Sequence, residues 1–165
     1  MKTIILPGFS LQNKDWAFAT KYNLSGLEQD IIVHEWFHWI SERDEDFNSD
    51  MEAAKINISE EINIIAKSIG TLVAVKALKK QKINKIIFLG IPLNDLRESD
   101  FKDYEILKDF DINKCLFIQN NNDPHATQKE LSEFLQKINK NIKVLSKKRN
   151  DHEYPYWEEF KEFLA

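Results

Sequence analysis

The stretch Ile64-Ile65-Ala66-Lys67-Ser68-Ile69-Gly70-Thr71-Leu72 decides how the rest of this chain is interpreted. A short apolar run ends in a small residue, a serine and a glycine, and a second apolar run with helical spacing follows at once. This layout is typical of a nucleophile elbow, in which a serine occupies a sharp turn between a strand and a helix. The strained turn requires small residues two positions before and after the serine, and Ala66 and Gly70 satisfy that requirement.

Length and composition set the class of protein. The 165 residues predict one domain over residues 1–165, and a 42% hydrophobic content is typical of a globular protein. A net charge of −4 argues against nucleic acid or an anionic membrane as a partner. No apolar run approaches the roughly 18 residues that cross a membrane, and the single Cys115 allows no intrachain disulfide. We therefore expect a cytoplasmic protein without a membrane segment.

Apolar runs of strand length alternate with amphipathic stretches of helix length. The predicted strands are Thr3–Leu6, Ile31–Glu35, Ile62–Ala66, Lys85–Leu89, Cys115–Gln119 and Ile142–Leu145. The predicted helices are Lys14–Tyr22, Ser49–Lys55, Ile69–Gln81, Asp100–Asp109, Thr127–Asn139 and Tyr156–Phe163. Strands separated by helices imply a parallel sheet, and runs that are apolar on both faces imply helices on both sides. We predict an α/β fold, a three-layer sandwich with about six parallel strands, in which Asn63 is a polar exception.

Two polar loops could supply the partners of Ser68. A serine hydroxyl needs a base to take its proton, usually a histidine that a carboxylate orients, and at an elbow the chain order is Ser, acid, His. Asp123 follows the fifth predicted strand and His152 follows the sixth. Both loops then lie at the same sheet edge as Ser68. The sequence thus predicts a catalytic Ser68–His152–Asp123 triad.

The same edge of the predicted sheet offers an alternative acid, an alternative base and candidate oxyanion donors. Asp95, after the fourth predicted strand, is the rival acid, and His125 is the rival base. Acyl transfer also needs hydrogen-bond donors for the developing oxyanion. The backbone N–H of Ile69 is one expected donor, and the Phe9 N–H in the loop after the first strand is the other, with Ser10 as its alternative.

The chain resembles the α/β-hydrolase superfamily, and among its members the small single-domain serine hydrolases of the retinoblastoma-binding-protein-9-like group. The matching pieces are Leu6-Pro7-Gly8-Phe9-Ser10, Ala66-Lys67-Ser68-Ile69-Gly70, Asn122-Asp123-Pro124 and Asp151-His152. The resemblance implies a parallel sheet without the two leading antiparallel strands of larger members, and it implies no cofactor. Two departures are Ala66 in place of glycine and Pro7 where many members have histidine.

A second motif points to different chemistry. The residues His34-Glu35-Trp36-Phe37-His38 match H-E-x-x-H, which on a helix places two histidines on one face to bind zinc, with the glutamate as base. The preceding apolar run Ile31-Ile32-Val33 instead predicts a strand that enters the motif. We therefore expect no metal here and interpret the segment as packing that shapes the cleft near Ser68. A zinc hydrolase using His34, Glu35 and His38 remains the less favoured alternative.

These patterns predict a carboxylesterase-like serine hydrolase that cleaves an ester, thioester or amide through an acyl-enzyme. Its partner is then a small-molecule acyl substrate, which the sequence does not specify further. The alternative from another class is a non-catalytic binding or scaffold protein that keeps the same fold, because a fold alone does not determine function.

Overall fold

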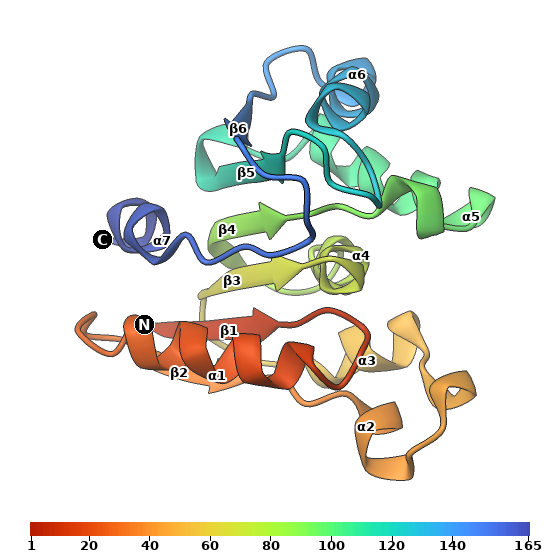
Figure 1. Ribbon diagram of the computed structural model, residues 1–165. Helices are drawn as coiled ribbons and strands as arrows, with labels where there is room; N and C mark the ends of the chain where they lie inside the picture. Colours follow the sequence, from red (N-terminus) through yellow and green to blue (C-terminus); the bar gives the residue numbers. More distant parts are fainter.

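The computed structural model describes all 165 residues and is built on a six-stranded parallel sheet (Figure 1). The strands are β1 (Lys2–Leu6), β2 (Asp30–Val33), β3 (Ile62–Lys67), β4 (Ile83–Leu89), β5 (Cys115–Asn120) and β6 (Val144–Lys147). Their order across the sheet is β2-β1-β3-β4-β5-β6, and every neighbouring pair is parallel. All carboxyl ends therefore lie at one edge, as the sequence predicted.

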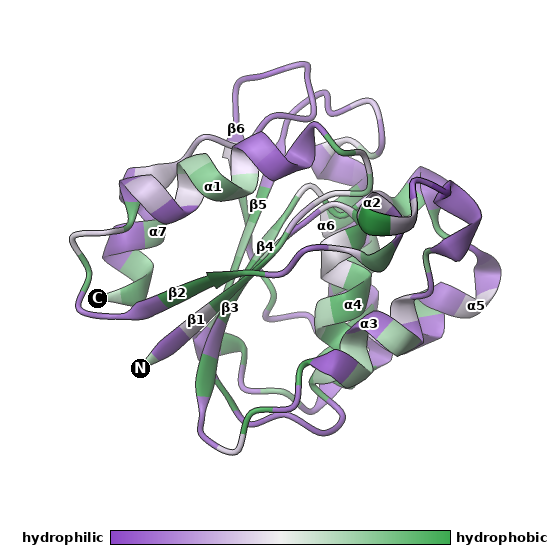
Figure 2. Ribbon diagram, turned by 90° about the horizontal axis from the view of Figure 1, so that it is seen from below, coloured by the Kyte–Doolittle hydropathy of each residue, from purple (hydrophilic) through white to green (hydrophobic).

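Helices cover both faces of the sheet (Figure 2). The helices α1 (Asn13–Asn23) and α7 (Trp157–Leu164) lie on one face, and α3 (Ser49–Lys55), α4 (Ile69–Ala77) and α6 (Gln128–Ile138) lie on the other. Alternate strand residues face opposite layers, so Ile65 belongs to the core with α1 and α7, whereas Ile64 belongs to the core with α4. The predicted three-layer α/β sandwich is confirmed. No helix combines the length and apolar character needed to cross a membrane.

The predicted elements differ from the structure mainly at their ends and in the connections. The strand predicted at Ile142–Leu145 begins two residues later, and the helix predicted at Asp100–Asp109 is a short α5 (Glu98–Phe101) followed by a 3₁₀ helix at Lys102–Lys108. The helix α2 (Phe37–Ser41) was not predicted, because its aromatic residues hide any helical period. Short 3₁₀ helices also occur at Asp44–Asp46, Leu93–Asp95 and Ile112–Lys114.

The structure explains the buried Asn63 within β3. The register between β3 and β4 shifts by one residue here, because Ile62 pairs with Ile83 whereas Ile64 pairs with Ile86. At this shift the Lys85 N–H donates to the Asn63 side chain instead of to a neighbouring strand. Asn63 Oδ1 accepts two hydrogen bonds, one from the Lys85 N–H at 3.1 Å and one from Asn84 Nδ2 at 3.0 Å. A polar side chain in the sheet thus satisfies backbone and side-chain donors at a bulge.

The turn between β3 and α4 is sharp, as the elbow pattern predicts. Ser68 has φ 55° and ψ −125°, a left-handed conformation that side-chain-bearing residues rarely adopt. The backbone approaches β1 closely at this point. A Cβ added to Gly70 would lie 2.3 Å from the Leu6 carbonyl oxygen and 2.7 Å from that of Pro7, so only glycine fits.

Replacing Gly70 by alanine is expected to destabilise the protein by about 1–3 kcal/mol, because the new methyl group would displace the backbone of β1 and of the loop that follows it. Gly26→Ala is the matched control, since a Cβ there meets no atom within 4 Å. Urea unfolding of both variants measures the difference. Equal stability of the two variants would contradict the close packing at the elbow.

Candidate active site

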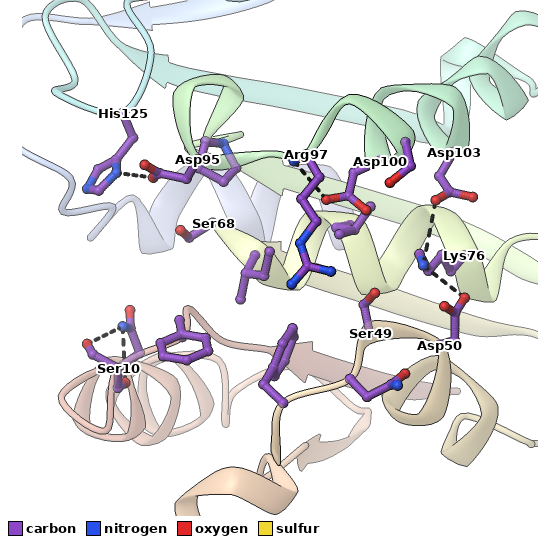
Figure 3. A pocket seen from close by; sticks show the side chains of 18 of the residues that line it. Ser10, Ser49, Asp50, Ser68, Lys76, Asp95, Arg97, Asp100, Asp103 and His125 are labelled. Atoms are coloured by element: carbon purple, nitrogen blue, oxygen red, sulfur yellow. Dashed lines mark hydrogen bonds and ion pairs between the residues drawn. The ribbon is translucent and has the colours of Figure 1, made fainter. Parts of the chain in front are cut away.

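Three loops at the carboxyl edge of the sheet bring Ser68, Asp123 and His152 together. They follow β3, β5 and β6 respectively. His152 Nδ1 lies 2.6 Å from Asp123 Oδ2. His152 lines the same cleft of about 910 Å³ as Ser68, which is labelled in Figure 3. His152 Nε2 is buried and has no hydrogen-bond partner, so it makes no bond to Ser68 Oγ. Such a contact is often loose before a substrate is bound.

Asp123 is held as a buried, ionised carboxylate. Its Oδ2 accepts the Tyr154 hydroxyl at 2.5 Å in addition to His152, and its Oδ1 accepts the His125 backbone N–H at 2.8 Å. Burial alone would raise the pKa of Asp123, but these hydrogen bonds outweigh burial and hold the pKa below its usual value. An ionised Asp123 keeps the proton of a neutral His152 on Nδ1 and leaves Nε2 able to accept one.

The rival residues Asp95 and His125 form a pair of their own. Asp95 Oδ2 is bound to His125 Nδ1, and both side chains are partly exposed on the cleft wall. The His125 ring lies against that of His152, with 4.2 Å between the ring centroids. The structure therefore brings Asp123, and not Asp95, to His152.

The loop after β1 is fixed by its carbonyl groups. The Gly8 oxygen accepts Trp36 Nε1 at 2.9 Å, and the Phe9 oxygen accepts both His38 Nε2 and Trp39 Nε1 at 2.8 Å. In a trans peptide the N–H points opposite to the carbonyl, so the N–H groups of Phe9 and Ser10 point away from these indole and imidazole donors.

Two of the backbone N–H groups predicted to bind an oxyanion, those of Phe9 and Ser10, have no acceptor within the protein. Ile69 is the first residue of α4, where an N–H has no partner within its own helix. All three residues line the cleft beside Ser68. The arrangement can stabilise negative charge on an oxygen held near Ser68, with either Phe9 or Ser10 as the second donor.

The H-E-x-x-H segment does not form a helical metal site. His34 precedes α2 and binds the buried Glu52 at 2.8 Å, whereas His38 lies within α2 and binds the Phe9 carbonyl. Glu35 pairs with Lys14 at 2.5 Å, so the three motif residues have three different partners. No group of three or more His, Cys, Asp or Glu side chains lies where it could hold a metal ion. The segment anchors the loop at Gly8 and Phe9 instead.

Sequence reasoning missed several residues that support this site. Tyr154 donates to Asp123 and gave no signal, because a tyrosine in a polar loop is unremarkable. Gly90, which directly follows β4 and has φ 58°, gave no signal either. A Cβ there would lie 2.6 Å from the Tyr154 ring and 2.9 Å from His152 Cε1, so this glycine makes room for the histidine.

Comparison with known families supports the superfamily that the motifs indicated. Residues 19–159 match a family model described as an alpha/beta hydrolase domain. The chain belongs to this family. In this alpha/beta hydrolase the match includes the elbow at Ser68 and the loops of Asp123 and His152, and it begins after the loop at Phe9. No curated protein matches the sequence. The narrower resemblance to the retinoblastoma-binding-protein-9-like group stays a prediction.

Replacement of Asp123 and replacement of Asp95 are expected to lower kcat to different degrees. Asp123→Asn is expected to lower kcat by a factor on the order of 10⁴, because an amide does not hold the required tautomer of the histidine, as in the serine-protease triad. Asp95→Asn is expected to cost far less, because Asp95 binds His125. Kinetics of the two variants on one ester, with circular dichroism as the folding control, measure the difference. A larger loss in Asp95→Asn would show that Asp95 is the acid.

Proposed function

We propose that this alpha/beta hydrolase is a serine hydrolase that cleaves an ester, thioester or amide through an acyl-enzyme. One observation carries the proposal. The only serine in a left-handed backbone conformation, Ser68, lines the same cleft as a histidine whose Nδ1 binds a buried carboxylate and whose Nε2 has no partner.

Acylation uses the groups on the cleft wall. Ser68 Oγ attacks the carbonyl carbon of the substrate while its proton moves to His152 Nε2. The carbonyl oxygen becomes negative and accepts the Ile69 N–H together with that of Phe9 or Ser10. When the carbonyl re-forms, the bond to the leaving group breaks, and the leaving group takes the proton from Nε2. Asp123 stabilises the imidazolium that exists between these two proton transfers.

Deacylation repeats these steps with water. Water gives a proton to His152 Nε2 and attacks the acyl carbon, and the bond to Ser68 Oγ then breaks as the proton returns to Oγ. The products are the acid and free enzyme. No cofactor enters any step, and each proton moves between atoms that the site provides.

The cleft favours acyl substrates that carry polar groups. Of its 19 lining residues only 4 are hydrophobic, so most of the side chains that a substrate meets are polar or charged. Its upper wall in Figure 3 is formed by the segment between β4 and β5, which includes Asp95, Arg97 and Asp100. This segment of 25 residues, 90–114, consists of short helices and supplies no separate lid domain.

The nucleophile assignment predicts that a fluorophosphonate probe labels Ser68 and that Ser68→Ala abolishes labelling. The Ser99→Ala variant is the control, because Ser99 lines the same cleft without the elbow conformation and its loss should leave labelling intact. Mass spectrometry of the labelled peptide identifies the residue. A label on another residue would contradict the assignment, and a folded protein that neither reacts nor turns over esters would favour the non-catalytic binding protein.

A further inference from the structure

The three arginines of the chain differ in their partners. Arg43 makes a two-pronged ion pair with Asp46, at 3.0 and 2.9 Å, and Arg149 makes one with Asp151, at 2.9 and 2.6 Å. Arg97 lines the cleft of Ser68, and its guanidinium has no hydrogen bond and no carboxylate within 4 Å. Figure 3 shows that this side chain points into the cleft.

The carboxylates of the cleft wall have other partners. Asp50 and Asp103 bind Lys76, at 2.8 and 3.6 Å, and Asp103 also binds Lys79 at 2.6 Å. Asp95 is paired with His125. Asp100 accepts the Arg97 backbone N–H. Of the two lysine and arginine side chains that line the cleft, Lys76 is paired, so the Arg97 guanidinium is the cation left for an anionic ligand.

The backbone of Arg97 is fixed even though its side chain is exposed. Its N–H donates to Asp100 Oδ2 at 3.0 Å at the start of α5, and the preceding Leu96 packs against the core. A guanidinium on a fixed backbone, with its donors facing the cleft, suits the planar, two-oxygen geometry of a carboxylate.

We propose that Arg97 binds a carboxylate on the substrate, so that the preferred substrates are esters, thioesters or amides that carry a free carboxylate away from the reacting carbonyl. This inference rests on the proposed serine hydrolase activity and names its substrate class. The carboxylate can lie on the acyl part or on the leaving group, and the two possibilities are separated by the choice of substrate pairs.

The test compares charged and neutral substrates of equal size. Mono-4-nitrophenyl adipate and 4-nitrophenyl hexanoate differ by a carboxylate at the end of the acyl chain. The butyrate esters of 4-hydroxybenzoate and 4-hydroxybenzamide differ by a carboxylate on the leaving group. The measured quantity is the ratio of kcat/KM for the charged over the neutral substrate of each pair, in the wild type, in Arg97→Gln and in the control Arg43→Gln.

We expect the wild type to favour the charged member of one pair, and Arg97→Gln to lower that ratio about tenfold or more, as the loss of a charge-assisted hydrogen bond does. Arg43→Gln should keep the wild-type ratio. The inference is overturned if the wild type prefers neither charged substrate, or if Arg97→Gln leaves the ratio unchanged. In both cases turnover of the neutral esters would show that the hydrolase proposal itself stands.

A second inference concerns Lys67, the residue directly before the nucleophile. Its side chain is only 3% exposed, which is rare for a lysine, and its Nζ lies 5.3 Å from the centre of the Trp16 ring. Nζ donates to Asn13 Oδ1 at 2.9 Å and lies 3.7 Å from a carboxylate oxygen of Glu153, the neighbour of His152. Burial lowers the pKa of Lys67, and the Glu153 carboxylate opposes that effect.

Asn13 carries the contact onward to the loop after β1. Its Nδ2 donates to the Ser10 carbonyl at 3.2 Å and to the Ser10 hydroxyl at 2.9 Å. The buried Lys67 ammonium thus contacts two groups. One is Asn13, which holds the loop of Phe9 and Ser10 (the oxyanion loop of the proposed mechanism), and the other is Glu153 in the loop that carries His152. A buried charge seldom stabilises a fold more than an apolar side chain of the same size would, so its presence calls for another reason.

We infer that Lys67 is a positioning residue, which through Asn13 and Glu153 holds the oxyanion loop and the His152 loop in register with Ser68. A structural role and a positioning role then predict opposite results for Lys67→Met. Methionine fills the same space but cannot donate a hydrogen bond, so stability should be kept or increased while the geometry around Ser68 is lost.

The experiment measures kcat, KM and the melting temperature of Lys67→Met on a neutral ester. We expect kcat to fall about tenfold with KM within about threefold, and Tm to be equal or higher. Lys85→Met is the control, since Lys85 also lies over an aromatic ring, at 5.8 Å from that of Phe163, but at the amino end of β4. Its kcat should match the wild type.

Asn13→Ala tests the connection. It should lower kcat to a similar degree, and the double variant should lose little more than either single one, because both changes break the same chain of contacts. An unchanged kcat in Lys67→Met, a loss of kcat that follows a loss of Tm, or fully additive effects in the double variant would overturn the inference. Labelling of Ser68 by the fluorophosphonate shows independently whether the hydrolase proposal stands.

Discussion

The rest of the site depends on the backbone of Ser68, which is held in a conformation that costs about 1–3 kcal/mol. Its neighbours secure it. The Ser68 N–H donates to the Leu89 carbonyl at 2.8 Å, which continues the pairing of β3 with β4. The Ser68 carbonyl accepts both the N–H and the hydroxyl of Thr71 in the first turn of α4. The sheet and the helix thus hold the strained residue together, and the closeness of Gly70 to Leu6 and Pro7 fixes where the loop of Phe9 and Ser10 begins.

The proposed mechanism adds a second constraint. Its oxyanion donors must be in place before a substrate arrives, because reorganising dipoles during the reaction would cost the energy that they supply. The Gly8 and Phe9 carbonyls are therefore fixed from behind by Trp36, Trp39 and His38. The Phe9 ring stacks on that of His38, with 4.4 Å between the centroids. The aromatic residues in and beside the segment that matches the zinc motif thus bind the backbone. Their indole and imidazole N–H groups donate to the Gly8 and Phe9 carbonyls.

The sequence was sufficient for the architecture because apolar runs of strand length are local signals, and parallel strands place their following loops at one edge. Ser68, Asp123 and His152 could be grouped on that basis alone. The contacts of Lys67 with Asn13 and of Tyr154 with Asp123 could not be predicted, because they join segments that are 54 and 31 residues apart and leave no periodic pattern. Asn63 was unexplained because a bulge depends on the register of two strands.

The two Asp–His pairs of this edge show why position alone does not assign a role. Asp95 and Asp123 both follow a strand, and each binds the Nδ1 of a histidine. The Asp123 side chain is fully buried and accepts two further donors, whereas that of Asp95 is 53% exposed. Water competes for an exposed carboxylate and screens its charge, so Asp95 orients its partner less firmly than the buried Asp123 does. The buried carboxylate, with its two further donors, fixes the orientation of the His152 ring, and this is the pair whose histidine Nε2 has no hydrogen-bond partner.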